Sequence, residues 1–552
     1  MPTQEIKPYF DIKKEFDVPI KSLMELFREI ARKNEQNNAT FFKGKFKTYH
    51  ELESEINKLS NAFHSLGIRK GDRIAALLPN CPQYITTFFA TQALGAVFTA
   101  INPMNSSVEI EKQLNDAKPK LLITLDIFTD KIKAIEEKLT LDHVIITSVA
   151  RELPNLKKYI YKLITMRKKV PLKNNLSYDA LIEKQEATAI DVPIKPKEDI
   201  AILQYTGGTT GSSKGAMLTH YNLISQTEML KYWRTGLEKQ PDGQLKIAGV
   251  LPYSHIFGLT SSFLWPIAEG ATIYLIPDPR KLEEIMSVIN DFKVQFLNCV
   301  PVFFLKFATH PHMNKYDYSS LHLCISGGES LPTETVKIFE EKTGCLLIEG
   351  YGLTEASPVT HANPPNRQQR STGSIGVPVP NTQARIVDTE TGEIITTPDV
   401  SGELWIKGPG VMKGYCKNDK ATNETIIDGW LRTGDVAILN DMGYYKIIDR
   451  LKDLIIVSGY KVWPNEVEEI LLTHPSILEA AIIPHHTELG TKIKAVLVKH
   501  HSSESISIED LRSYCKKFLA PYKIPSLIEY RDALPRSLVG KVLRRELQTI
   551  ME

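Results

Sequence analysis

The chain has 552 residues, more than one hydrophobic core supports, so we expect two to four domains. Its composition, 42% hydrophobic and 24% charged, is that of an ordinary globular protein, and a net charge of +2 argues against wholesale nucleic-acid binding. The six cysteines form no Cys-x-x-Cys pair, and the N-terminus has no apolar signal core. We therefore expect a cytoplasmic protein with reduced thiols, neither secreted nor integral to a membrane.

Apolar, strand-like runs alternate with helical patterns along the first 150 residues. Helical spacing over 23–31 and 49–66 is followed by the apolar runs 73–78 and 120–124. The same rhythm returns between residues 247 and 326. Because such alternation favours a parallel sheet covered by helices, we expect an N-terminal body with two α/β layers.

A basic amphipathic segment occupies residues 156–169. Apolar residues recur there at helical spacing, beginning with Leu156 and Tyr159, and lysines and arginines surround them. Such a helix can lie on an anionic membrane, so peripheral contact with the inner membrane face stays open. We favour the alternative, the solvated face of an ordinary domain helix.

An apolar run ends in a loop of Gly, Thr and Ser within residues 203–216. Glycine lets the backbone approach a phosphate, hydroxyls add donors, and Lys214 adds a positive charge, so the loop is a candidate triphosphate cradle. The position of Lys214, three residues beyond Gly211, does not fit the Walker pattern. Taken alone, this composition is as typical of a flexible surface loop. Thr219 then stands where it could cap the following helix.

The sequence pattern changes near residue 375. Short strands separated by Gly, Pro and Asp predict a small β-sheet or barrel over 375–450. A fresh helix–strand rhythm follows Arg450. We therefore predict an N-terminal body over 1–450 and a smaller α+β domain over 451–552.

Five motifs follow the loop in order. They are Ser326-Gly-Gly-Glu-Ser330, Glu349-Gly-Tyr-Gly-Leu-Thr-Glu355, Gly429-Trp-Leu-Arg-Thr-Gly-Asp435, Asp449-Arg-Leu-Lys-Asp453 and Leu534-Pro-Arg-Ser-Leu-Val-Gly-Lys-Val-Leu-Arg544. With the loop, in this order and spacing, they closely resemble the acyl-adenylate-forming superfamily of AMP-dependent synthetases and ligases. The resemblance extends over essentially the whole chain, and the segment 458–467 is most similar to the fatty-acyl-CoA synthetase branch.

That resemblance implies that ATP activates a carboxylic acid in two steps. The first yields acyl-AMP and pyrophosphate, and in the second coenzyme A attacks the adenylate. ATP, Mg²⁺ and coenzyme A as co-substrate are the implied small molecules. The resemblance also implies a mobile C-terminal domain with its hinge at Lys452.

The resemblance further implies roles for individual residues. Asp435 would accept the ribose hydroxyls with Arg450 as a second contact, and Lys541 would bridge the substrate carboxylate and the α-phosphate as the catalytic cation. Thr354 would contact the α-phosphate, and Glu355 with Thr206 would hold Mg²⁺. The adenine would lie among Gly328, Glu349, Gly350, Tyr351 and Gly352. The β- and γ-phosphates would be held by Thr206, Gly207, Gly208, Thr209, Thr210, Gly211 and Lys214.

The segment 251–258 resembles the family's motif beside the acyl pocket. Members that activate amino acids need an acid there to pair with the substrate ammonium, and this segment has none. His255 would shape the site near the substrate carboxylate, with a packed core histidine as the alternative. The apolar residues 300–305 would line a hydrophobic tunnel, unless they are ordinary core. We therefore expect a medium- to long-chain fatty acid as substrate.

Two other functions remain open from the sequence. One is a ligase that activates an aryl acid or loads an acyl carrier protein. The other is a non-catalytic nucleotide or fatty-acid binder, against which the joint presence of Thr206, Glu355, Asp435 and Lys541 argues.

Two histidine pairs and the oligomeric state complete the prediction. His310 with His312, and His485 with His486, lack further ligands at a recognisable spacing, so we expect no histidine metal site. A homodimer is left open by the sequence. Nothing in the sequence points to a nucleic-acid partner.

Overall fold

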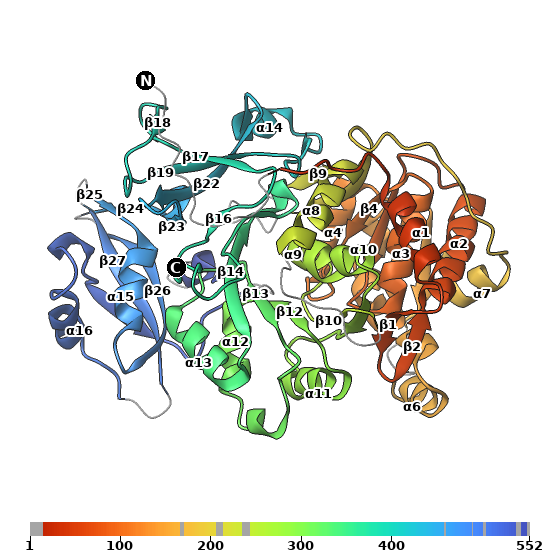
Figure 1. Cartoon of the computed structure of the whole chain (residues 1–552), viewed down its shortest axis with the longest axis horizontal. Helices are drawn as coiled ribbons and strands as arrows, with labels where there is room; N and C mark the ends of the chain where they lie inside the picture. Colours follow the sequence, from red (N-terminus) through yellow and green to blue (C-terminus); the bar gives the residue numbers. More distant parts are fainter. Residues whose placement is uncertain are drawn as a thin grey trace.

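The chain folds into two large sheets, a smaller third sheet and a C-terminal domain (Figure 1). A computed structural model describes residues 15–165, 170–205, 214–233, 243–457, 460–487, 490–500, 504–536 and 542–548, without the side chains of 162–165. The predicted fold class, two α/β layers with a β-rich part and a small α+β domain, is confirmed.

The first sheet has eight strands in the order β20-β9-β8-β4-β3-β5-β6-β7. The strands from β8 to β7 are parallel, whereas β9 runs antiparallel to both β8 and β20. This order places the short strand β20 beside the segment that leaves the Gly/Thr/Ser loop. The strand bounds are β3 Arg73–Leu77, β4 Val97–Ala100, β5 Leu121–Leu125, β6 His143–Thr147, β7 Asn175–Ser177, β8 Ile200–Tyr205, β9 Gly215–Thr219 and β20 Gly414–Tyr415.

The second sheet has nine strands in the order β16-β15-β14-β13-β12-β10-β11-β1-β2. Its central strands are parallel, so the carboxyl ends of β13 and β14, where two of the motifs lie, meet at one edge. The strand bounds are β1 Asn38–Phe42, β2 Lys45–Thr48, β10 Lys246–Gly249, β11 Thr272–Leu275, β12 Phe296–Cys299, β13 Leu323–Ser326, β14 Leu346–Gly352, β15 Val359–Ala362 and β16 Val377–Pro378.

The third sheet is antiparallel and forms the β-rich part. It begins at β17, because β16, inside the predicted range 375–450, pairs with β15 of the second sheet. Its strands are β17 Gln383–Val387, β18 Ile394–Ile395, β19 Gly402–Lys407, β21 Ile426–Ile427, β22 Trp430–Leu439 and β23 Tyr445–Arg450.

The C-terminal domain has its own small core. The ribbon β24–β25 and the sheet β26-β27-β28 pack with helices around buried residues such as Val467, Leu497 and Leu511. Figure 1 shows this domain beside the β13 and β14 side of the body. Its elements are β24 Ile455–Val457, β25 Tyr460–Val462, α15 Pro464–Leu472, β26 Ile477–Thr487, β27 Gly490–Lys499, α16 Ile508–Cys515, β28 Leu527–Tyr530 and α17 Arg544–Gln548.

The helices of the body begin at sequence signals that satisfy their first N–H groups. Capping boxes start α1 at Ser22, α2 at Thr48 and α4 at Ser106. Thr219 caps α8, as predicted, by accepting a hydrogen bond from the Asn222 N–H at 3.1 Å. The body helices are α1 Leu23–Lys33, α2 Tyr49–Ser65, α3 Pro82–Ala93, α4 Ser107–Ala117, α5 Thr129–Lys133, α6 Asn155–Thr165, α7 Tyr178–Glu183, α8 His220–Trp233, α9 Ile256–Leu259, α10 Trp265–Ala268, α11 Leu282–Phe292, α12 Pro301–Ala308, α13 Thr333–Thr343 and α14 Asp419–Thr425.

The main core joins the two large sheets. Helix α3 is buried along its whole length, and one hydrophobic cluster contains Phe98 from β4 together with Ile273 from β11. Aromatic rings of Tyr84, Phe88 and Phe263 meet edge to face in this cluster. This packing holds the carboxyl ends of the strands, and the loops that follow them, in fixed relative positions.

Candidate nucleotide and acyl site

The heptapeptide 349–355 runs off the carboxyl end of β14. Glu349 stands opposite Ser326 of β13, and Tyr351 stands opposite His361 of β15. At Gly352 the chain passes so close to Pro358 that a Cβ would lie 2.0 Å from the Pro358 carbonyl oxygen, so only glycine fits there. The two motifs at 326–330 and 349–355 therefore share one sheet edge.

A third motif segment packs against this edge. The Phe257 ring lies 3.0 Å from the position that a Cβ on Gly327 would take, and the Gly350 carbonyl oxygen lies 3.2 Å from it. A side chain at residue 327 would have to push both away. The tertiary structure thus brings Phe257 of the segment 251–258 against Gly327, beside Gly350. Gly328 follows in the exposed loop after β13.

Two of the predicted nucleotide residues, Tyr351 and Arg450, contact a third, Asp435. Asp435 on β22 and Arg450 on β23 are cross-strand neighbours, and Arg450 Nε lies 3.2 Å from Asp435 Oδ1. The Tyr351 hydroxyl donates to Asp435 Oδ2 at 2.5 Å. Burial and the Asp435 carboxylate raise the pKa of Tyr351, so its hydroxyl keeps the proton that it donates. A ribose would share this carboxylate with Tyr351 or displace its hydroxyl.

Glu349 is a buried acid at the start of the heptapeptide. Burial raises its pKa to about 8, so the carboxyl group is protonated at neutral pH. A protonated carboxyl group both donates and accepts a hydrogen bond, which suits the mixed donor and acceptor edge of a base. Gly350, next in the chain, pairs with Ala362 through the β14–β15 ladder.

Glu355 lies in a half-buried turn after β14, next to Thr354. The Tyr415 hydroxyl donates to Glu355 Oε1 at 2.6 Å, and the Lys214 ammonium lies 4.9 Å from the centre of the Tyr415 ring. The structure therefore brings Lys214, at the exit of the Gly/Thr/Ser loop, close to the heptapeptide. Within the loop itself, the predicted phosphate ligands Thr206, Gly207, Gly208, Thr209, Thr210 and Gly211 lie outside the described residues.

The donor set fits Mg²⁺ in chemical type. A half-buried carboxylate, one oxygen of which accepts a hydrogen bond from Tyr415, is a suitable ligand for a hard cation, which prefers carboxylate and hydroxyl oxygens beside phosphate. The predicted second ligand, Thr206, lies outside the described residues.

His255 begins the short helix α9 and is half-buried. Its Nδ1 accepts a hydrogen bond from the Phe257 N–H at 3.3 Å, so the neutral ring carries its proton on Nε2. Burial lowers the pKa of His255 to about 4, and the ring is neutral at physiological pH. His255 is thus equipped to donate one hydrogen bond from Nε2.

The apolar run 300–305 forms the start of α12. Phe304 and Phe307 pack edge to face or tilted against Phe339, and Phe303, Phe304 and Phe307 are buried. Val302 is half-buried at the margin of this cluster. Much of the run is therefore core, and the acyl tunnel remains a prediction for the half-buried margin.

The C-terminal motif contacts the loop after β13. Arg536 lies 3.1 Å from Glu329 and 2.7 Å from Glu479, and the Val542 N–H donates to Glu329 Oε1 at 3.0 Å. Residues on both sides of Lys541 are thus bonded to the motif 326–330, although Lys541 itself lies outside the described residues.

The predicted hinge residue, Lys452, lies in a short 3-10 turn directly after Arg450 and β23. Its ammonium group has a lowered pKa because of partial burial and the neighbouring Arg450 cation. This turn is where the body passes into the C-terminal domain. The hinge itself stays a prediction.

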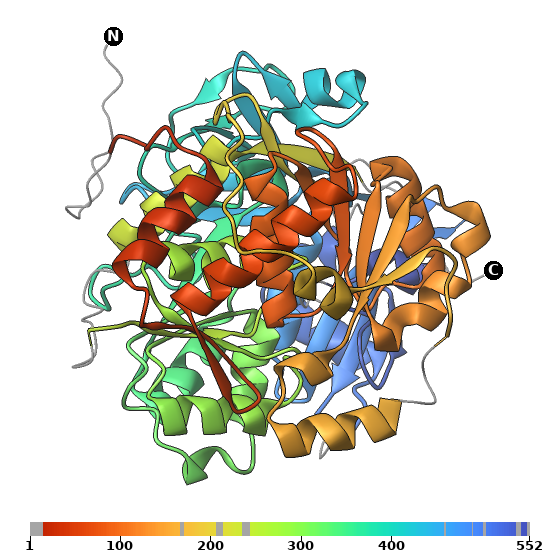
Figure 2. The same cartoon turned by 90° about the vertical axis from the view of Figure 1, so that its right-hand side faces the viewer.

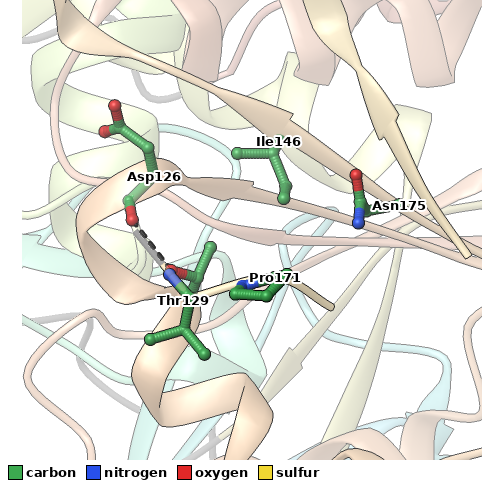
Figure 3. A pocket seen from close by; sticks show the side chains of 6 residues that line it. Asp126, Thr129, Ile146, Pro171 and Asn175 are labelled. Atoms are coloured by element: carbon green, nitrogen blue, oxygen red, sulfur yellow. Dashed lines mark hydrogen bonds between the residues drawn. The ribbon is translucent and has the colours of Figure 1, made fainter. Parts of the chain in front are cut away.

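One pocket lies elsewhere. It is a cavity of about 300 Å³ in the first layer, and its lining residues, drawn in Figure 3, are Asp126, Thr129, Ile146, Val170, Pro171 and Asn175. It shares no residue with the motifs, and Thr129 donates across its rim to the Asp126 carbonyl oxygen at 3.0 Å. The chemistry predicted from the motifs therefore does not coincide with this pocket.

The family models and the relatives agree with this geometry. Residues 27–416 match the model of the AMP-binding enzyme, and residues 466–541 match that of the AMP-binding enzyme C-terminal domain. The chain belongs to the AMP-binding enzyme family. A long-chain-fatty-acid–CoA ligase of Bacillus subtilis (strain 168) is 38% identical, over 97% of this chain and 96% of that protein. One from Salmonella typhimurium is 36% identical, over 96% of this chain and 94% of that protein.

Solved structures of the same family share the fold. An anthranilate CoA ligase, AuaEII, in complex with anthranoyl-AMP superposes with a TM-score of 0.85 at 25% identity, covering 97% of this chain and 98% of that one. ATP-bound MatB from Rhodopseudomonas palustris gives a TM-score of 0.83 at 26% identity, covering 96% and 99%. The predicted recognition of an adenylate-forming ligase is thereby confirmed.

Three contact residues of this AMP-binding enzyme were missed by sequence reasoning. Glu329 and Arg536 lie inside motifs that were recognised, but no role was assigned to their side chains. Tyr415 lies outside the motifs, and a tyrosine after glycine carries no chemical signal by itself. The pairing of β20 with β9 brings Tyr415 near Lys214, and its side-chain contacts with Glu355 and Lys214 show that it faces the site.

A cluster of possible metal ligands also emerges. Glu283 joins His310 and His312, with ligand atoms that all lie within 4.8 Å of one another. The third ligand that the sequence spacing lacked comes from the start of α11. His312 Nδ1 contacts the Glu283 carboxylate directly, so these exposed groups satisfy one another.

Among the described residues, no helix has both the length and the apolar character that a membrane crossing requires.

Proposed function

We propose that this protein is an AMP-forming ligase that joins a long-chain fatty acid to coenzyme A. The observation that carries the proposal is that Tyr351 on β14 contacts Asp435 of the third sheet, which also holds Arg450, with Glu355 in the turn that follows β14. It is supported by long-chain-fatty-acid–CoA ligases that are 33–38% identical along nearly the whole chain. The acyl side offers apolar and neutral groups, which suits a fatty acid.

The first half-reaction transfers the adenylyl group. An oxygen of the fatty-acid carboxylate attacks the α-phosphorus of ATP, the bond to the bridging oxygen breaks, and pyrophosphate leaves. In our proposal Asp435 and Arg450 hold the ribose, Tyr351 and Glu349 flank the adenine, and Thr354 contacts the α-phosphate.

Three further groups of the chain complete this proposed step. Lys541 neutralises charge between carboxylate and α-phosphate, and Lys214 with residues 206–211 holds the departing phosphates. Glu355 and Thr206 would bind Mg²⁺, which supplies positive charge to the phosphate oxygens when bound.

The second half-reaction transfers the acyl group. The sulfur of coenzyme A attacks the acyl carbonyl carbon, the bond to the phosphate oxygen breaks, and AMP leaves. We propose that His255, neutral and protonated on Nε2, donates to an oxygen at this acyl carbon. A turn of the C-terminal domain about Lys452 would bring different groups to the same carbon for the two steps.

The test is a panel of acids from C2 to C20 with aryl acids included. Acid-dependent pyrophosphate exchange and AMP release are measured with coenzyme A and, separately, with a holo acyl carrier protein. We expect exchange and thioester formation to peak with long-chain acids and coenzyme A. A peak with aryl acids or acetate, or a strict need for the carrier protein, would contradict the proposal.

In this proposal a membrane surface supplies such a substrate, and helix α6 offers a face for it. The helix lies at the edge of the molecule in Figures 1 and 2, with Leu156, Tyr159 and Ile160 exposed by 76%, 66% and 48%. Lys157 and Lys158 stand among these apolar side chains. We propose that this face contacts an anionic bilayer, because exposed apolar residues flanked by lysines favour such surfaces.

The membrane proposal is tested by sedimentation with vesicles of phosphatidylcholine and phosphatidylglycerol. The double variant Leu156→Gln/Ile160→Gln should lose most of the bound fraction while keeping its activity on dispersed fatty acid. Pure phosphatidylcholine vesicles should bind less protein, and salt should weaken binding. Equal sedimentation of variant and wild type would remove α6 from the proposal.

A further inference from the structure

Tyr415 occupies a fixed position between the phosphate loop and the heptapeptide. It ends β20 and pairs with Ala216 of β9, two residues after Lys214. The same segment is pinned on its other side, because the Met412 N–H donates to the Glu355 carbonyl oxygen at 2.8 Å. Thr422 accepts a hydrogen bond from the Tyr415 N–H at 2.9 Å. The segment from Met412 to Tyr415 is thus held by the β9 ladder, by the Glu355 carbonyl oxygen and by Thr422.

The side chain of Tyr415 touches two groups of opposite charge. Its hydroxyl donates to Glu355 Oε1 at 2.6 Å, and its ring faces the Lys214 ammonium at 4.9 Å. Burial and the Glu355 carboxylate raise the pKa of Tyr415, which keeps the hydroxyl a donor. Within the described part of the chain, Lys214 and Glu355 form no ion pair with each other.

This arrangement has a physical consequence for an ATP site. An ammonium and a carboxylate this close to one tyrosine would, in direct contact, neutralise each other and withhold both charges from the substrate. A hydrogen bond to a charged group is stronger than one between neutral groups, and an aromatic ring attracts a cation that lies over its face. The tyrosine therefore contacts each group separately, and among the described residues neither Glu355 nor Lys214 forms an ion pair.

We propose that Tyr415 is a positioning residue that keeps the Glu355 carboxylate aimed at the divalent cation of ATP and keeps Lys214 apart for the phosphates. The inference rests on the proposed function, since it assumes that MgATP is the substrate. It assigns different tasks to two parts of one side chain. The hydroxyl orients the Glu355 carboxylate, and the ring holds the Lys214 ammonium.

The experiment separates these two tasks in the full-length protein. Tyr415→Phe removes the hydroxyl and keeps the ring, whereas Tyr415→Leu removes both. Tyr49→Phe is the matched control, because its hydroxyl is also buried but donates to the Ala271 carbonyl oxygen at 2.8 Å in the distant core. Mn²⁺ is the metal probe, and α,β-methylene-ATP prevents turnover.

Tyr415→Phe should weaken Mn²⁺ binding in the presence of the ATP analogue by about tenfold, the lower end of a charged hydrogen bond. Binding of the metal-free analogue should stay as in wild type and in Tyr49→Phe. Tyr415→Leu should weaken both Mn²⁺ and the metal-free analogue. The Mg²⁺ concentration for half-maximal pyrophosphate exchange should rise in parallel with the Mn²⁺ dissociation constant.

Two results would overturn the inference. One is unchanged Mn²⁺ affinity in Tyr415→Phe, and the other is an equal loss of metal and metal-free binding in that variant, which a general structural defect produces. Failure of the proposed function shows differently, because the wild type would then release no pyrophosphate with any acid.

Discussion

The proposed nucleotide side and the proposed acyl side of the site rely on different kinds of contact. On the nucleotide side, polar groups hold one another at short distances, as in the Tyr351 hydroxyl at 2.5 Å and the Arg450 guanidinium at 3.2 Å from Asp435. On the acyl side, α12 contributes buried rings such as Phe304, packed against Phe339, and His255 is a neutral donor.

This difference shows what residue type alone conveys. A charge or a hydroxyl has few uses in a half-buried site, so its partner chemistry follows from its identity. An aromatic ring fills volume in a core and in a substrate tunnel alike. The proposed nucleotide roles follow from the resemblance of whole motifs, such as 349–355, to the family, whereas chain-length preference depends on the shape that many side chains leave open.

The largest expected effect comes from Lys541, the proposed bridge between the substrate carboxylate and the α-phosphate. Lys541→Ala should slow adenylate formation by about a thousandfold, because it removes a cation that stabilises charge in the transition state. Thioester formation from supplied acyl-AMP should stay close to wild type. Separate assays of the two half-reactions check this. If Lys541→Ala lost both half-reactions, the assignment of Lys541 to adenylate formation alone would be wrong.

On the nucleotide side, Asp435→Asn should raise the KM for ATP by about 10- to 100-fold, since it removes charged hydrogen bonds of about 1.5–3 kcal/mol and leaves Arg450 without its carboxylate. The order of preference among acids should not change. Initial rates with two acids of different length test this. A shift in acid preference would show that Asp435 also affects binding of the acid.

On the acyl side, Val302→Phe should change the preference among acids and leave the KM for ATP unchanged. Added volume at this half-buried position should lower kcat/KM for the longest acids by about tenfold relative to medium-chain acids, the scale of one or two methylenes in an apolar pocket. The KM for ATP should remain that of the wild type. A uniform loss for all acids would place Val302 in the core and not at a tunnel wall.

The smallest effect concerns pH and Glu349. Its pKa of about 8 in the folded protein exceeds the ordinary value of 4.5, so the folded state holds a proton that the unfolded state has lost. Stability contributed by this group is therefore lost as the pH rises from 4.5 through about 8.

Glu349→Gln, a permanently neutral isostere, should flatten that pH dependence. Urea midpoints and ATP affinity, measured between pH 6 and pH 9, should fall less in the variant than in wild type. His322→Asn, at an exposed residue before the amino end of β13 and away from the site, serves as the control. Identical slopes in wild type and Glu349→Gln would assign the pH dependence to other groups.

Much of the fold was open to prediction because its signals are local. Capping residues such as Thr48 and Thr219 fix helix starts, and apolar runs such as 73–78 fix strands. The strand order was not predictable, since pairing depends on contacts between distant segments. The pairing of β16 with β15, and not with the third sheet, is one example.

The sequence by itself determined the chemistry of this protein: a carboxylate at Asp435, a carboxylate at Glu355, cations at Lys214 and Arg450, and glycines where the backbone must approach. The tertiary structure decided which of these groups meet. It placed Tyr415 between Lys214 and Glu355 and joined Glu329 to Arg536 across the two domains. The reason is that residue type fixes what a side chain can bond, whereas long-range packing of separate strands fixes what lies within reach.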